Sequence, residues 1–192
     1  MKSRKYVFSA LFAAIISIGC IIAIPLPGGV PLTVQNLFAI LAGTILGTFY
    51  GALSVTLWLI IGAVGIPVFA NAHGGIAIIL GPTGGYMLGY LLASLFAGIL
   101  LGSPKISESK KTVRQIAKIA VIALIAYALV YLPGIPWFMH VMESKGKPVT
   151  FQAALKLTFI PFIPGDFIKW LITIPLTLTL RPIAARYLEI EN

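Results

Sequence analysis

The stretch LFAAIISIGCIIAI, residues 11–24, is apolar on every face of any regular structure that it could form. It lies within a longer region, residues 6–104, that contains no Asp, Glu, Lys or Arg. A soluble domain does not cover its surface without charged residues. The whole chain of 192 residues is 59% hydrophobic and 10% charged, whereas about a quarter of the residues in soluble proteins are charged. The sequence therefore predicts a membrane protein.

The apolar runs favour helices over a transmembrane barrel, whose strands would alternate apolar and polar residues over about ten positions. A helix needs about 20 apolar residues to cross the hydrocarbon core, so the chain has room for about six spans and little else. We expect an all-α, compact bundle that forms a single domain over residues 1–192. The apolar runs, divided by Pro, Gly and charged residues, predict spans at 6–24, 33–49, 51–65, 84–102, 114–132 and 164–181.

Two segments allow other interpretations. The first 29 residues have the basic start and apolar core of a signal peptide, but the apolar stretch exceeds the usual length of about 7 to 15 residues and no A-x-A-like cleavage site follows. We interpret it as the first span. The third run is short for a full crossing, and residues 66–85 after it are expected to be partly helical or re-entrant, buried in protein or lining a cavity.

The basic residues predict the orientation of the bundle, since cytoplasmic loops are rich in Lys and Arg. With six spans the termini share one side, and the count of basic residues is ten there against four elsewhere, which places both termini in the cytoplasm. The linkers 25–35, 66–85 and 133–165 then converge on the outer face, where we expect a binding site. The ten residues are Lys2, Arg4, Lys5, Lys105, Lys110, Lys111, Arg114, Lys118, Arg181 and Arg186; the four are Lys145, Lys147, Lys156 and Lys169.

Several function classes find no support in the sequence. The net charge of +9 comes from residues at the ends of apolar runs and not from one patch, so nucleic-acid binding is not indicated. One cysteine, Cys20, and two isolated histidines, His73 and His140, make neither a disulfide nor a metal site. No phosphate-loop, G-x-S-x-G or H-E-x-x-H pattern is present. We therefore predict no enzymatic activity, no cofactor and no metal.

Asp166 and Lys169 are the most informative pair, because they lie three residues apart in the otherwise apolar segment IPFIPGDFIKWLITIPL, residues 160–176. This spacing places them on one side of a helix. Ionisable groups at membrane depth usually face a bundle interior or a cavity. They could simply neutralise each other. Alternatively, a carboxylate that offers acceptors and an ammonium that offers donors would bind a solute with a donor at one end and an anionic group at the other.

Uncharged residues of the outer linkers are weaker candidates. GPTGGY, residues 81–86, could be a bend, or its glycines could let the backbone approach a ligand beside the ring of Tyr86. Gln35 and Asn71 carry amides that need hydrogen-bond partners when buried, either from the protein or from a ligand. Ala10 and Ala14 have the small-xxx-small spacing that allows close helix packing, within the bundle or against a partner.

Four motifs together resemble one protein family. PLPGGVPLTVQ (25–35), AGTILGTFYGALSVTLWLIIGAVGIPVF (42–69), GPTGGY (81–86) and PFIPGDFIKW (161–170) occur in this order over nearly the whole chain. In this combination they look like BioY, the biotin-specific substrate-capture subunit of energy-coupling factor transporters. The segment FANAHGG, residues 69–75, departs from the smaller residues that many relatives have, which leaves the ligand contacts of that loop open.

The resemblance implies a multi-pass protein of the prokaryotic plasma membrane that binds biotin near its outer face. Asp166 would accept hydrogen bonds from the ureido ring, and Lys169 would pair with the valerate carboxylate. Asn71 and Gln35 would supply further polar contacts, and Tyr86 a wall for the rings. Uptake would require a coupling transmembrane protein and a pair of cytoplasmic ATPases.

By the same resemblance, Ala10 and Ala14 would form a docking face for the coupling protein. The alternative function is a self-sufficient secondary transporter of a small anionic solute, although no internal repeat of the kind common in such transporters is evident. Uptake by the purified protein that depends on a coupling ion would favour this alternative.

Overall fold

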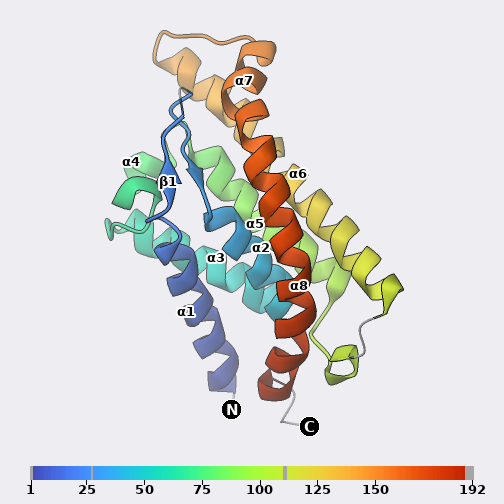
Figure 1. Cartoon of the computed structure of the whole chain (residues 1–192). Helices are drawn as coiled ribbons and strands as arrows, with labels where there is room; N and C mark the ends of the chain where they lie inside the picture. The colour runs from blue at the N-terminus through green and yellow to red at the C-terminus, as the bar shows by residue number, and fades with distance from the viewer. Residues whose placement is uncertain (1, 27, 110–111, 189–192) are drawn as a thin grey trace.

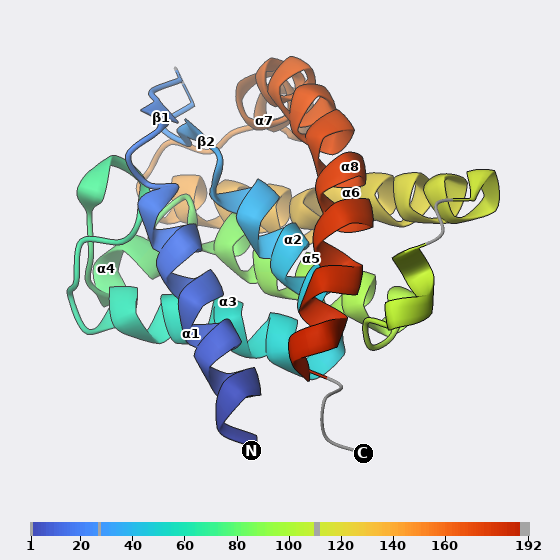
Figure 2. The same cartoon turned by 60° about the horizontal axis from the view of Figure 1, so that its bottom comes forward.

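Six long helices build the protein, and α2 (Gln35–Leu46) lies at their centre (Figures 1 and 2). The computed structural model describes residues 2–26, 28–109 and 112–188. The all-helical architecture expected from the sequence is confirmed. The other long helices are α1 (Lys2–Ile18), α3 (Thr48–Ala63), α5 (Gly84–Leu101), α6 (Val113–Ser144) and α8 (Ile163–Leu188).

The central position of α2 follows from its sequence, QNLFAILAGTIL, which is apolar around most of the helix. Every residue of α2 except Phe38 is buried, and the helix contacts α1, α3, α5, α6 and α8. Its two amides, Gln35 and Asn36, occupy its first turn. The first turn of α2 therefore presents two amides inside the bundle, while Thr44 near its other end pairs with Thr177.

Small residues allow α2, α3 and α5 to pack closely. A Cβ atom added at Gly43 would lie 2.1 Å from the Ser94 carbonyl oxygen of α5, and one at Gly51 would lie 2.6 Å from the Cα of Gly43. Gly47 joins α2 to α3 with a φ of 80°, a conformation that favours glycine. In lipid, such close approach replaces the hydrophobic effect as a source of helix association.

The shorter elements gather at the end of the bundle opposite to the chain termini (Figure 1). They are joined to the long helices by the outer linkers predicted from the sequence. The segment 66–83 contains a short helix and a 3-10 turn, as expected. The shorter elements at this end are β1 (Ala23–Ile24), β2 (Leu32–Thr33), η1 (Ala70–Ala72), α4 (Ile76–Ile79), α7 (Phe151–Thr158) and η3 (Ile160–Phe162); η2 (Ile106–Ser109) precedes α6.

Two predicted boundaries were wrong. The first span was expected to reach residue 24, but α1 ends at Ile18 and residues 23–24 form β1, which pairs with β2. The linker expected from residue 133 begins only after Ser144, because α6 continues through Pro133 and Pro136. Tertiary packing explains this continuation: the missing side chain of Gly85 admits Trp137 and the Pro133 carbonyl, since an added Cβ would lie 2.4 and 2.5 Å from them.

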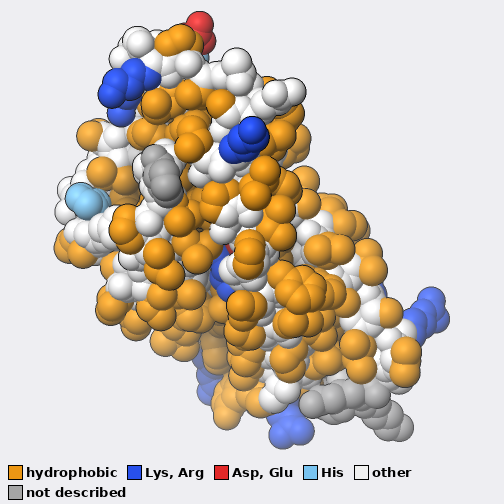
Figure 3. Space-filling view, turned by 45° about the horizontal axis from the view of Figure 1, so that its top comes forward, with side chains coloured by type: hydrophobic (Ala, Val, Ile, Leu, Met, Phe, Trp, Pro, Cys, Tyr) orange, Lys and Arg blue, Asp and Glu red, His pale blue; other side chains and the backbone are white. Residues whose placement is uncertain are grey.

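The outer surface of the bundle suits a lipid environment. Figure 3 shows hydrophobic side chains over most of one face, with basic side chains toward its ends. Within the described ranges, three helical stretches are long and apolar enough to cross a membrane, and α2 and α3 are shorter apolar helices. The three stretches are Gly84–Leu101, Val113–Ser144 and Phe151–Leu188.

Candidate functional site

Asp166 and Lys169 are buried in the first half of α8 and contact each other. The Lys169 Nζ lies 2.7 Å from the Asp166 Oδ1, as their spacing on one helix face allows. Asp166 falls in the first turn of α8, where a negative charge is favoured by the helix dipole. The two residues therefore form an ion pair inside the protein. This pair is compatible with both alternatives from the sequence, a structural pair and a ligand site.

Asn36, which the sequence analysis did not single out, connects the pair to α2. Its Nδ2 donates to the Asp166 Oδ1 at 2.9 Å, and its Oδ1 accepts from the Lys169 Nζ at 2.8 Å. Lys169 also donates to the carbonyl oxygen of Thr33 at 3.0 Å. An ammonium has three N–H donors. All three donors of Lys169 are thus engaged by Asp166, Asn36 and Thr33.

Tyr131 of α6 completes the group by donating its hydroxyl proton to the Asp166 Oδ2. Its ring packs edge-on against Phe159, with centroids 4.8 Å apart, and against Tyr86 at 6.0 Å. Tyr131 was not identified from the sequence. We call Asn36, Tyr131, Asp166 and Lys169, with the Thr33 carbonyl, the polar cluster; it joins α2, α6 and α8.

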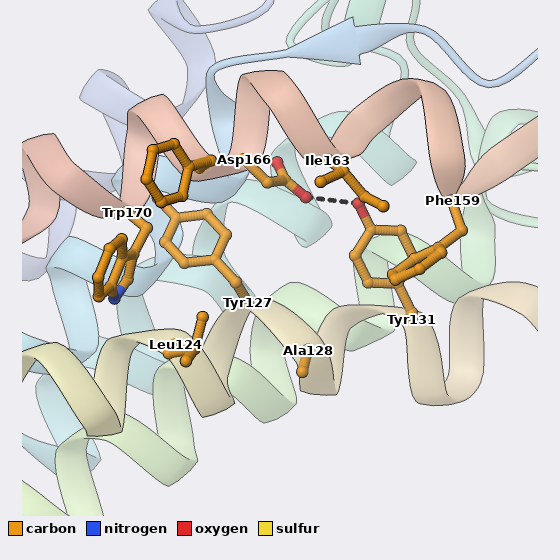
Figure 4. Close-up of a pocket in the computed structure, with 9 residues that line it drawn as sticks. Leu124, Tyr127, Ala128, Tyr131, Phe159, Ile163, Asp166 and Trp170 are labelled. Atoms are coloured by element: carbon orange, nitrogen blue, oxygen red, sulfur yellow. Dashed lines mark hydrogen bonds between the residues drawn. The ribbon is translucent and has the colours of Figure 1, made fainter.

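Two spaces of different size adjoin the polar cluster. A cavity of about 20 Å³, room for about one water, is lined by Asn36, Tyr86 and Lys169 among others. A groove of about 200 Å³ between α6 and α8 reaches Asp166 from the other side. Figure 4 shows the rings of Tyr127, Tyr131, Phe159 and Trp170 lining this groove, with Asp166 turned toward Tyr131. Tyr131 lines both spaces and separates them.

Tyr86 and Gln35, both predicted ligand contacts, are buried next to this region. The Tyr86 hydroxyl has no hydrogen-bond partner among the described residues, and its ring lines the small cavity. Gln35 donates its Nε2 protons to the carbonyl oxygens of Ile16, at 3.2 Å, and Val68, at 2.8 Å. Gln35 thereby connects α2 to the end of α1 and to the loop after α3, while also lining a cavity of about 20 Å³.

Asn71 lies at the surface, away from the polar cluster, in η1. Its φ of 58° is left-handed, a conformation that asparagine tolerates better than most residues. It lines a hollow of about 310 Å³, which we call the outer hollow, formed by residues 29–31 and 70–83 with Met87 and Lys145. The structure therefore brings Asp166, Lys169 and Tyr86 together and places Asn71 in a separate, larger space.

Ala10 and Ala14 are both exposed on α1, next to other exposed apolar residues such as Val7, Leu11 and Ile18. The opposite side of α1, which includes Ala13 and Ile16, packs into the bundle. The face of α1 that contains Ala10 and Ala14 is thus exposed in the described part of the chain. This arrangement is compatible with docking of a partner or with exposure to lipid.

A second buried cation, Arg181, lies further along α8. Its Nε donates to the Glu108 Oε2 at 2.5 Å. Its other nitrogens donate to the carbonyl oxygen of Thr44, in the last turn of α2, and to those of residues 101–103 at the end of α5. The carbonyls of Thr44 and Leu101 lie in the last turns of α2 and α5 and lack partners within their own helices, and Gly102 and Ser103 directly follow α5. The sequence analysis had counted Arg181 as a topology signal.

The protein is thus helical, with apolar helices long enough to span a membrane. It holds a buried polar cluster at the end of the bundle where its irregular loops gather. Among the described residues, no group of His, Cys, Asp and Glu could hold a metal ion. The chain belongs to the BioY family, whose family model matches residues 1–186. It is a transport protein and not an enzyme, and the family indicated by the sequence motifs is confirmed.

Relatives match most of the chain. It is 38% identical over 169 residues to the probable biotin transporter BioY of Pyrococcus horikoshii, covering 88% of this chain and 91% of that protein. It is 34% identical over 189 residues to the biotin transporter BioY of Thermotoga maritima, covering 98% and 99%. A solved structure described as the S-component for biotin from an ECF-type ABC transporter matches with a TM-score of 0.77 and 29% identity, covering 94% of this chain and 92% of the other.

Proposed function

We propose that this chain is the biotin-binding subunit of an energy-coupling factor transporter in the prokaryotic plasma membrane. The observation that supports this most directly is the polar cluster, in which a buried carboxylate, an amide and an ammonium meet beside apolar and aromatic walls. Biotin has a ureido ring with N–H donors, a carboxylate and an otherwise apolar body. The relatives from Pyrococcus horikoshii and Thermotoga maritima are described as a probable biotin transporter and a biotin transporter, which agrees with this choice of ligand.

In this proposal residues 1–192 form one domain of six spans with both termini in the cytoplasm. The common location of the termini at one end of the bundle supports this topology. Arg181 and Lys169 are buried, so we leave them out of the count of basic residues. The count then changes from ten on the side of the termini and four elsewhere to nine and three. Of the nine, Lys110 and Lys111 lie outside the described residues, as does the side chain of Lys2.

Asp166 is the proposed acceptor for the ureido N–H groups. A carboxylate has about four acceptor positions, and three are used here by Lys169, Asn36 and Tyr131. The adjacent cavity holds about one water, so the segment around Thr33 must move to admit the ring. The pairing of Lys169 with the ligand carboxylate stays a prediction, and it requires displacement of one of its three present acceptors.

Tyr86 and Gln35 are proposed to border the same ligand, and Asn71 to contact it from the outer loops. Release inward is proposed to need partners, a coupling transmembrane protein and a pair of cytoplasmic ATPases, because a tight site opposes release. The exposed face of α1 that contains Ala10 and Ala14 supports docking of the coupling protein there, since small residues permit close helix contact.

Equilibrium binding of biotin to the detergent-purified protein tests the proposal. We expect tight binding to the wild type, weakened roughly 10- to 100-fold by Asp166→Asn, because a hydrogen bond to a charged group is worth about 1.5 to 3 kcal/mol. Lys156→Ala, at an exposed position near the end of α7, is the matched control and should change nothing. A folded wild type that does not bind biotin would refute the proposed ligand.

A further inference from the structure

The outer hollow is the largest of the spaces described above, at about 310 Å³. It is formed where three outer segments meet: residues 29–31 before β2, residues 70–83 between α3 and α5, and Lys145 directly after α6. Lys145 and Asn71 both line it and are exposed to solvent. A solute can therefore reach this space without any movement of the protein.

The outer hollow continues toward the polar cluster through two smaller cavities. It shares Pro31 and Thr83, among others, with a cavity of about 20 Å³ beneath residues 30–33. That cavity in turn shares Thr33 and Tyr86, among others, with the cavity beside Lys169. All three spaces are lined by Pro31 and therefore adjoin the segment 30–33. Displacement of this segment would join them into one elongated site.

An anionic solute in such a site needs a donor for its carboxylate. Lys169 has no free N–H, because its three donors are used by Asp166, Asn36 and Thr33. The groove between α6 and α8 has Asp166 as its sole charged lining residue among those described, and this residue would repel an anion. The outer hollow, in contrast, combines the ammonium of Lys145 with the amide of Asn71.

We propose that the outer hollow is the carboxylate subsite, in which Lys145 and Asn71 bind the anionic end of the ligand while its ring lies toward Asp166. This inference rests on the proposed function and specifies the orientation of the ligand. It differs from the orientation predicted by resemblance, in which Lys169 pairs with the carboxylate. Lys145 also follows the C-terminus of α6, where a cation is favoured by the helix dipole, so the test must separate binding from stability.

The test compares biotin with biotinamide, its uncharged counterpart, on purified full-length protein. The wild type should prefer biotin. Lys145→Ala should raise the Kd for biotin about fivefold, near the upper limit for an exposed ion pair, and leave the Kd for biotinamide within about twofold. It should also slow association of biotin at low salt, because a charge at the rim of a site steers an anion inward. Lys145→Arg should retain the preference.

Lys147→Ala is the matched control, since Lys147 is an exposed lysine two residues away that does not line the outer hollow. Loss of the preference for biotin in Lys145→Ala, with retention in Lys147→Ala, supports the inference. It is overturned if Lys145→Ala keeps the preference, if Lys147→Ala loses it equally, or if the wild type binds both ligands alike. A wild type that binds neither ligand instead refutes the proposed function, so the two failures are distinct.

Discussion

Lys169 and Arg181 are buried cations twelve residues apart on the same helix, α8, yet their surroundings differ in kind. Arg181 binds one carboxylate and the carbonyl oxygens at the ends of two helices. Lys169 binds two side chains and the carbonyl of Thr33 in the short strand β2, and it borders a cavity. A buried charge alone therefore does not mark a ligand site. A ligand site is indicated instead when the partners of the buried charge are side chains that a ligand can replace.

The comparison has a physical basis. Two of the carbonyl groups that Arg181 binds, those of Thr44 and Leu101, belong to the last turns of α2 and α5, so they cannot turn away without distortion of those helices. Asn36 and Tyr131 are side chains, and they can rotate to receive a ligand. We therefore expect Arg181 to act on stability alone and the polar cluster to act on both stability and binding. The predictions below challenge this division.

The largest effect is expected for Arg181→Met. It removes the cation that pairs with Glu108 and leaves several carbonyls near the ends of α2 and α5 without this donor, and breaking a buried ion pair costs about 3 to 5 kcal/mol. Thermal unfolding in detergent should show a large fall in Tm or loss of folded protein. Arg186→Ala, an exposed arginine on the same helix, should be nearly neutral. A stable Arg181→Met protein would contradict the structural role.

A smaller loss of stability is expected for Lys169→Met, about 3 kcal/mol, because Asp166 keeps donors from Asn36 and Tyr131. The double variant Asp166→Asn/Lys169→Met should regain most of this loss, since it removes both charges, while biotin binding should stay at least as weak as in Asp166→Asn. Tm and biotin affinity, measured on the same samples, separate the two effects. Recovery of binding together with stability would show that the pair is purely structural.

The smallest effect is expected for Asn36→Ala, which removes one bridging amide but leaves the ion pair. The free energy of unfolding should fall by about 1 kcal/mol, and biotin affinity should fall about tenfold because Asp166 is less firmly positioned. Ser17→Ala in α1, whose hydroxyl donates to the Ala13 carbonyl, is a control outside the cluster. Unchanged affinity in Asn36→Ala would exclude a positioning role.

Hydrophobic pattern and charge were sufficient to predict the helical bundle and the location of the six long helices, because apolar runs and the residues that interrupt them are local features. The proximity of Asp166 and Lys169 could also be predicted, because their spacing of three residues on one helix is a local feature. Asn36 was missed because its partners lie 130 and 133 residues away, and a single amide beside Gln35 gives no sign of which one faces α8.

The predictions made from Pro133, Pro136 and Arg181 were wrong for a related reason. Pro133 and Pro136 suggested a loop, but the helix persists because Pro133 and Trp137 pack against Gly85 at the start of α5. Trp137 also donates to the carbonyl of Gly81, which precedes α5, at 2.9 Å. Arg181 looked like an interfacial charge, and its partners at the ends of other helices become visible only in three dimensions. In both cases tertiary contacts override a local preference.

The length of α6 has a consequence for hydration. Its 32 residues measure about 48 Å at 1.5 Å per residue, and even a tilt of 40° leaves about 37 Å across a hydrocarbon core of about 30 Å. In the proposed topology Arg114 and Lys118 would anchor its beginning at the interface, so the end that precedes Lys145 would project from the membrane. A carboxylate bound there remains at the water boundary, and the ligand would lose its hydration shell from the ring end first.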